Sequence, residues 1–110
     1  MSTTSVGQEA EGLVVRELQS RGHKVIAKNW RTRRCEIDIV STKDGCAYMT
    51  EVKYRGSRNF GDGFDCIGPR KLKQMAYAAE IWVSEQKWAG DYRLMAASVD
   101  SKAQIQILEI

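Results

Sequence analysis

Asp38, Glu51 and Lys53 are the residues of this sequence whose types and spacing could do chemistry together. They flank Asp44-Gly45, and such a dipeptide between two runs of alternating apolar residues is the strongest short-range signal for a β-hairpin. Its two-residue turn sets a register in which Asp38 lies directly opposite Glu51, with Cβ atoms roughly 4.5 to 5.5 Å apart. Two negative charges that close repel by about 3 kcal/mol at an effective dielectric constant of about 20. We therefore expect a divalent cation, a shared proton or Lys53 to offset the repulsion.

A Mg²⁺ ion, with Mn²⁺ as a substitute, answers this geometry best, because it binds hard carboxylate oxygens and keeps positions for water and phosphate. Glu11 would supply a third oxygen, since it shares the inward stripe of Val14 and Leu18 on an expected helix. A metal ion beside a lysine and several arginines points to phosphodiester hydrolysis. Lys53 would orient the nucleophile or neutralise charge in the transition state. The expected catalytic residues are Glu11, Asp38, Glu51 and Lys53, and the expected metal ligands are Glu11, Asp38 and Glu51.

The same hairpin has a plainer interpretation, as a solvated surface ribbon. In the expected register Glu36 lies opposite Lys53, and the two would form an ordinary cross-strand ion pair. Alternation along the strands puts the charged residues on one face and a second set of residues on the other. That second set is Ile37, Ile39, Tyr48, Thr50 and Val52.

Basic residues are concentrated in the middle of the chain. Ten of the 17 lysines and arginines lie between residues 31 and 73, although the net charge is only +3. A cluster of this kind is either a solvated basic face or a surface that binds the phosphates of a nucleic acid. Trp30, beside Arg31, is the tryptophan best placed to contact a base. The residues expected to bind DNA are Trp30, Arg31, Arg33, Arg34, Arg55, Arg58, Arg70, Lys71 and Lys73.

Length and composition indicate one small domain over residues 1–110. The chain has 110 residues, 28% of them charged, and no stretch approaches the roughly 20 apolar residues of a membrane span. We therefore expect no membrane partner. The first residues lack the basic start and apolar run of a secretory signal, so we expect a cytoplasmic protein. An odd number of cysteines without a CxxC pair supports neither a disulfide framework nor a structural zinc site, and we expect free thiols.

The order of the periodic segments predicts an α/β fold, with elements in the order α-β-β-β-α-β-β. Helices are expected over about residues 8–20 and 69–86, strands over 24–29, 35–41, 46–54, 92–99 and 104–108, and a glycine-rich loop over 56–68. This order predicts a mixed, mostly antiparallel sheet flanked by two helices. Pro69 suits the first turn of the second helix. The expected core stripe of that helix is Leu72, Met75, Ala76, Ala79, Trp82 and Val83.

A longer set of motifs resembles a known family. Asp38 followed by Glu51-Val52-Lys53 is similar to the D…(D/E)xK signature of the PD-(D/E)XK nucleases. With these residues, a set of short runs resembles the YraN-like family of small predicted endonucleases, which are related in fold to archaeal Holliday-junction resolvases. The runs are Asn29-Trp30-Arg31, Glu36-Ile37-Asp38-Ile39-Val40, Glu51-Val52-Lys53-Tyr54-Arg55, Phe60-Gly61 and Pro69-Arg70-Lys71, and the resemblance extends over about residues 10–87.

The resemblance implies a restriction-endonuclease-like core and a metal-dependent DNA endonuclease, with Glu11, Asp38, Glu51 and Lys53 at the matching site positions. Branched or junction DNA is the expected substrate. Hydrolysis of both strands by so small a chain implies a homodimer. Two alternatives stay open, namely a sequence-specific mobile-element or phage-type endonuclease of the same fold, and a non-catalytic DNA-binding module.

Overall fold

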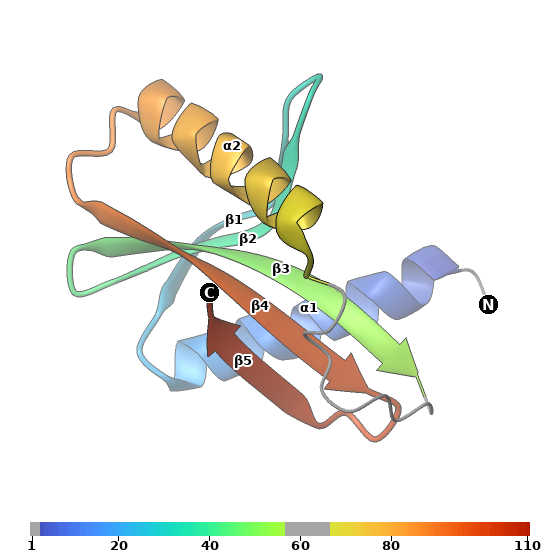
Figure 1. Ribbon diagram of the computed structural model, residues 1–110. Helices are drawn as coiled ribbons and strands as arrows, with labels where there is room; N and C mark the ends of the chain where they lie inside the picture. The colour runs from blue at the N-terminus through green and yellow to red at the C-terminus, as the bar shows by residue number, and fades with distance from the viewer. Residues whose placement is uncertain (1–2, 57–66) are drawn as a thin grey trace.

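The computed structural model describes residues 3–56 and 67–110, and Figure 1 shows how they are arranged. The elements are α1 (Thr3–Ser20), β1 (Lys24–Arg31), β2 (Glu36–Lys43), β3 (Cys46–Gly56), α2 (Pro69–Gln86), β4 (Asp91–Asp100) and β5 (Ile105–Glu109). This order confirms the predicted α/β fold. Most of the expected loop over 56–68 lies outside the described residues. Within the described ranges, neither helix is long and apolar enough to cross a membrane.

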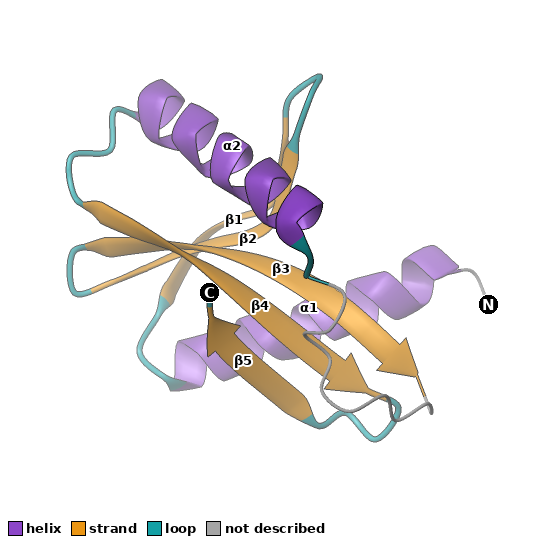
Figure 2. Cartoon of the chain, viewed as in Figure 1, coloured by secondary structure: helices purple, strands orange, loops and turns teal. Residues whose placement is uncertain are grey.

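The five strands form one sheet in the order β1-β2-β3-β4-β5. Neighbouring strands are antiparallel except β3 and β4, which run parallel. A parallel pair requires a crossover connection between its strands, and α2 lies in that connection (Figure 2). The sheet is therefore mixed and mostly antiparallel, as the sequence predicted.

Helix α1 covers one face of the sheet and α2 covers the other (Figure 1). The α1 layer buries Ala10, Val14 and Leu18 against sheet residues that include Ile39. Burying an aliphatic side chain of the size of valine or leucine stabilises a fold by about 1.5 to 3 kcal/mol. This layer therefore fixes α1 on the sheet, and with it the position of Glu11 in the middle of the helix.

Helix α2 has its predicted bounds, and its core stripe differs in part from the predicted one. Its buried residues are Met75, Ala78, Ala79 and Trp82. The stripe is wrong for Leu72, whose side chain stays 37% exposed. The buried face of α2 runs through Met75, Ala78, Ala79 and Trp82, and the helical spacing places Leu72 toward its edge.

The β2–β3 hairpin has the predicted two-residue turn. Asp44 and Gly45 have φ values of 52° and 79°, and positive φ at both central residues is typical of a type I′ turn. The pairing runs from this turn to Ile39, which lies opposite Thr50. The predicted register is therefore confirmed along this ladder.

One feature of β2 contradicts the sequence-based alternation. Ile39 packs in the α1 layer, but Ile37 packs in the α2 layer, so the prediction that both share one face is wrong. Asn29 lies opposite Asp38, between two ladder pairs, and has φ of 53°. A left-handed residue turns the strand locally. Beyond this position, the end of the β1–β2 hairpin lies beside α2 (Figure 1).

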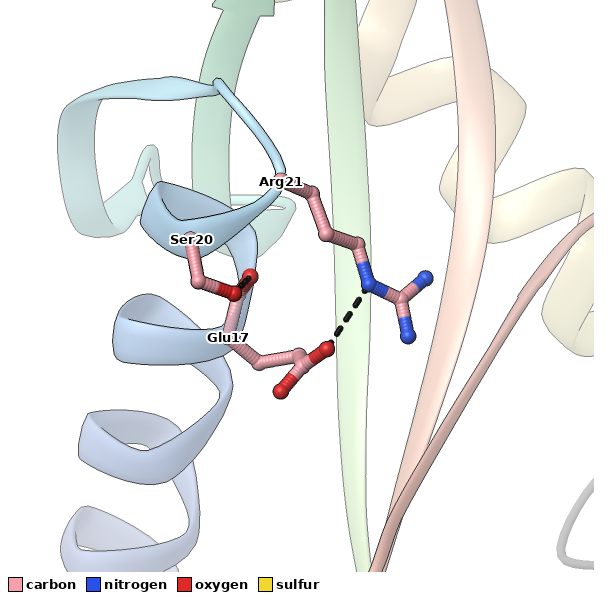
Figure 3. A network of polar contacts seen from close by, with 3 residues as sticks. All are labelled: Glu17, Ser20 and Arg21. Carbon is pink, nitrogen blue, oxygen red and sulfur yellow. Dashed lines mark hydrogen bonds and ion pairs between the residues drawn. The ribbon is translucent and has the colours of Figure 1, made fainter.

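The C-terminal end of α1 is closed by contacts among its own residues (Figure 3). Arg21 Nε donates a hydrogen bond of 2.8 Å to Glu17 Oε2, and Ser20 Oγ donates one of 2.7 Å to the Glu17 carbonyl. Gly22 follows with φ of 93°, a conformation that favours glycine at the end of a helix. The Glu17 carboxylate is thus paired with Arg21, the first residue after α1.

Candidate functional site

Asp38 lies where the regular pairing of β2 and β3 ends. One residue beyond the last ladder pair, its Oδ2 accepts a hydrogen bond of 2.8 Å from the backbone N–H of Val52. Val52 separates Glu51 from Lys53 in the chain. The hydrogen bond therefore fixes the Asp38 carboxylate next to the segment that holds the other two predicted residues.

Other carboxylates surround Asp38 and change its ionisation. Burial raises the pKa of Asp38 from 3.8 to about 6, although the Val52 N–H lowers it. The negative charges of Glu51, Glu11 and Glu36 add to the increase in this pKa. Acidic residues of α1, β2 and β3 therefore lie close enough to Asp38 to raise its pKa. The sequence analysis predicted that Glu11, Asp38 and Glu51 are grouped in this way.

Glu51 is balanced by two lysines. Its side chain is only 11% exposed, and its Oε2 lies 2.9 Å from Lys71 Nζ and 3.7 Å from Lys53 Nζ. A buried carboxylate requires such partners, because transfer out of water costs it far more than a neutral group. Lys71 was predicted to bind DNA. In the structure it lies in the first turns of α2 and forms an ion pair with Glu51.

Glu11 is held from the sheet by Asn29, a residue to which the sequence assigned no role. Asn29 Nδ2 donates a hydrogen bond of 3.2 Å to Glu11 Oε1. Asparagine tolerates the left-handed conformation that Asn29 adopts better than most residues do. Asn29 is the last residue of the strand predicted over 24–29, where a residue depleted in strands is expected, so nothing in its residue type singled out this position.

Glu36 does not form the ion pair with Lys53 that the simple register predicted. It lies opposite Arg31 on the β1–β2 ladder, and its Oε2 is 3.6 Å from Arg31 Nη2. The reason is that the β2–β3 ladder ends at the Ile39–Thr50 pair, so residues 36 and 37 of β2 pair with β1 alone. The plainer interpretation of the hairpin as a ribbon with a Glu36–Lys53 pair is therefore wrong in that detail.

Asp38 and Glu51 are the acidic residues that could hold a Mg²⁺ ion. Among the residues that the structure describes, no three His, Cys, Asp or Glu side chains are gathered as a metal-binding group. Mg²⁺ is usually bound through one or two carboxylates, together with water and substrate phosphates. Asp38 and Glu51 carry such oxygens, and a cation beside Asp38 would favour its charged form against the burial and the neighbouring negative charges that raise its pKa. Glu11 contributes negative charge from α1 and is held by Asn29.

The residues predicted to bind DNA lie in several parts of the structure. Trp30 is half-buried and packs against the α2 layer, which leaves only part of its indole accessible. Arg31, Arg33 and Arg34 are exposed at the end of the β1–β2 hairpin. At the other positions, Arg70 and Lys73 are exposed on the first turns of α2, Lys71 and Arg55 are half-buried, and Arg58 lies outside the described residues.

The fold and these residues define a class of protein, a small α/β protein whose mixed sheet brings acidic residues from three elements next to a lysine. Residues 10–109 match the sequence profile described as "Uncharacterised protein family UPF0102". The chain belongs to this family, which is the YraN-like group of the PD-(D/E)XK superfamily. The resemblance found in the motifs is thereby confirmed.

Curated relatives are similar to the chain over most of its length. A "UPF0102 protein" of Pseudomonas putida strain KT2440 is 34% identical over 91 residues, which are 83% of this chain and 73% of the relative. A relative from Sulfurihydrogenibium is 36% identical over 94 residues, covering 84% and 82% of the two chains. A Fusobacterium nucleatum relative is 30% identical, covering 86% and 78%. The acidic site lies within the matched range 10–109.

Proposed function

We propose that this chain is a metal-dependent endodeoxyribonuclease that hydrolyses phosphodiester bonds in branched or junction DNA. The observation that supports this function is the position of Asp38, half-buried, bonded to the Val52 N–H and surrounded by acidic residues of α1, β2 and β3. Such an excess of negative charge destabilises a fold unless a ligand balances it. A divalent cation with a bound phosphate is a ligand of that kind.

Asp38 and Glu51 would hold the Mg²⁺ or Mn²⁺ ion, with Glu11 close by. When bound, the ion lowers the pKa of a water and withdraws charge from the phosphoryl oxygens. The Lys53 side chain is 40% exposed, and its Nζ lies 3.7 Å from Glu51 Oε2. It can therefore donate to a phosphate oxygen outside the protein while it stays beside the carboxylates, and it would neutralise charge in the transition state.

Positive charge next to the acidic residues supports DNA as the substrate. Exposed arginines lie at the end of the β1–β2 hairpin, and Arg70 and Lys73 lie on the first turns of α2. Both segments contribute residues to the wall of one cavity, and Glu51 also lines that cavity. Phosphate contacts by such residues supply most of the affinity of sequence-independent DNA binding.

A second copy of the chain is part of the proposal. One site cuts one strand, so cutting both strands of a junction requires two sites. We therefore expect a homodimer on DNA, and analytical ultracentrifugation of the protein with and without a four-way junction measures it. A 1:1 complex that still cuts both strands would contradict this part of the proposal.

A second candidate function is a non-catalytic DNA-binding module. The observation in its favour is that Lys71 and Lys53 already balance Glu51 without any metal ion. Such a module would bind DNA with a steep dependence on salt and would leave it intact.

Cleavage assays on a panel of DNA structures test the proposal. The purified protein is incubated with Mg²⁺ or Mn²⁺ and with linear duplex, flap, four-way junction or single-stranded DNA. We expect junction or flap DNA to be cut, and we expect Asp38→Asn and Lys53→Ala to lower the cleavage rate by about 100-fold or more. Affinity for DNA, measured in EDTA, should change little, because neither substitution removes an exposed arginine.

Matched substitutions exclude a general effect of changed charge. Asp44→Asn changes the same group in the exposed hairpin turn, and Lys102→Ala changes an exposed lysine after β4. Both variants should cleave like the unmodified protein. Equal cleavage by Lys53→Ala would remove Lys53 from the catalytic role. DNA binding without cleavage in either metal would favour the binding module.

A further inference from the structure

A cavity of about 400 Å³ lies between the end of the β1–β2 hairpin and the first turns of α2. Its volume is within the range of pockets that bind small ligands or single groups of larger ones. Glu51 and Lys71, which form the 2.9 Å ion pair described above, belong to its wall. The cavity is therefore continuous with the acidic site.

One wall of this cavity is formed by α2 and carries an exposed aromatic ring. Tyr77 is 40% exposed and lines the cavity, and Met75, only 8% exposed, lines it from another side of the helix. Tyr77 falls outside the core stripe of α2, and in the described part of the chain its ring packs against no other aromatic ring. A tyrosine that is neither core nor paired offers a free aromatic face, on which a nucleic-acid base can stack.

The opposite wall is basic and polar. Arg34 lines the cavity from the hairpin, and its guanidinium forms no ion pair with any residue that the structure describes. Arg31 also lines it, 68% exposed and 3.6 Å from Glu36. On the α2 wall, Gln74 adds an exposed amide that can bind the edge of a base. Aromatic, basic and amide groups around one hollow are the set that binds a single-stranded nucleotide.

We propose that this cavity holds one unpaired nucleotide of the DNA substrate, next to the phosphate at the acidic site. Its base would stack on Tyr77, and its phosphate would contact Arg34. The inference rests on the proposed function and narrows its substrate to DNA with an unpaired nucleotide beside the cut. A base inside a stacked duplex cannot enter such a pocket without leaving the helix, which costs energy.

Binding of two matched DNA probes tests the cavity separately from catalysis. One probe is a blunt duplex, and the other is a forked duplex with two unpaired arms and the same total number of nucleotides. Fluorescence anisotropy in EDTA measures the affinity for each probe. We expect the fork to bind about 10-fold more tightly than the blunt duplex, as stacking of one or two bases would give.

Substitutions of Tyr77 decide whether this preference comes from the cavity. Tyr77→Ala should remove most of the preference for the fork and leave affinity for the blunt duplex unchanged. Tyr77→Phe should retain the preference, because the ring stacks without its hydroxyl. Tyr92→Ala, a change to an exposed tyrosine of β4 that does not line the cavity, should behave like the unmodified protein.

Two results would overturn the inference. One is equal affinity of the unmodified protein for both probes, and the other is a Tyr77→Ala variant that loses affinity for both probes to the same extent. Failure of the proposed function gives a different result, in which a Tyr77-dependent preference for the fork persists while no probe is cut in Mg²⁺ or Mn²⁺. Asp38→Asn should keep the preference in EDTA, since Asp38 does not line the cavity.

Discussion

Asp38 and Glu51 carry the same charge, but their surroundings balance it differently. Glu51 has two lysine ammonium groups within 4 Å of one oxygen, whereas the Asp38 carboxylate has a hydrogen bond from a neutral backbone N–H. At the scale of single residues, the unbalanced charge of the site is therefore located on Asp38. A residue that destabilises the fold in this way is typical of a position kept for binding or catalysis.

At this scale, the prediction concerns how the ionisation of Asp38 makes the stability of the protein depend on pH. The pKa of Asp38 is about 6 in the folded protein and 3.8 in the unfolded chain. The folded protein therefore binds the proton of the Asp38 carboxyl group more tightly than the unfolded chain does. The contribution of Asp38 to stability is therefore complete below pH 3.8 and is lost as the pH rises through about 6. We expect Asp38→Asn to raise the free energy of unfolding in EDTA at about pH 8 by on the order of 1 to 2 kcal/mol, a value reduced for solvent screening.

Urea unfolding at several pH values measures this effect. The gain from Asp38→Asn should shrink toward zero at acidic pH, because the native aspartate is then neutral too. Asp44→Asn, in the exposed turn, serves as the control and should show no such dependence. A loss of stability in Asp38→Asn at alkaline pH, or a difference that does not vary with pH, would contradict the assignment of unbalanced charge to Asp38.

At the scale of elements, the β2–β3 turn packs against the start of β4. A Cβ atom placed on Gly90 would overlap the carbonyl oxygen of Gly45 and would lie 3.2 Å from the Trp88 ring. Backbone atoms cannot move away as the end of a flexible side chain can. This contact holds the turn that sets the register of Asp38 and Glu51 against the strand that follows α2.

The element-scale prediction is that Gly90→Ala destabilises the protein by about 1 to 3 kcal/mol, the usual cost of forcing extra volume into a packed contact. Gly12→Ala, on α1, is the matched control. A Cβ atom added there would have no atom of another part of the protein within 4 Å. That change should stabilise the helix by about 0.5 to 1 kcal/mol. Thermal unfolding of both variants measures the two effects, and equal melting temperatures would contradict the close contact.

At the scale of the whole molecule, charge is distributed unevenly. The net charge is only +3, yet exposed basic residues adjoin the cavity at the hairpin end and the first turns of α2. The opposite layer, α1, neutralises part of its own charge through Glu17 and Arg21. DNA is therefore expected to approach from the side of α2.

The whole-molecule prediction uses the dependence of DNA affinity on salt. Arg70→Gln removes one exposed charge from the first turn of α2, and the slope of log affinity against log salt should fall in magnitude by about one. Arg16→Gln removes the same charge from the exposed side of α1 and should leave the slope nearly unchanged. If both substitutions lower the slope equally, DNA does not bind preferentially on the α2 side.

The sequence by itself determined the order of the elements, the bounds of α2 and the register of the β2–β3 hairpin. These features depend on neighbours in the chain: apolar spacing, Pro69 at a helix start and the Asp44-Gly45 turn. Because the register is local, the proximity of Asp38 to Glu51 could be predicted as well.

Only the tertiary structure decided which partners those residues have. Lys71 reaches Glu51 because α2 crosses the sheet, and Asn29 reaches Glu11 because α1 packs on the opposite layer. The β2–β3 ladder ends at Ile39, Ile37 packs in the α2 layer, and Glu36 pairs with Arg31 of β1. These contacts depend on segments that are distant in the chain, and their free energies depend on burial, which periodicity along one strand does not specify.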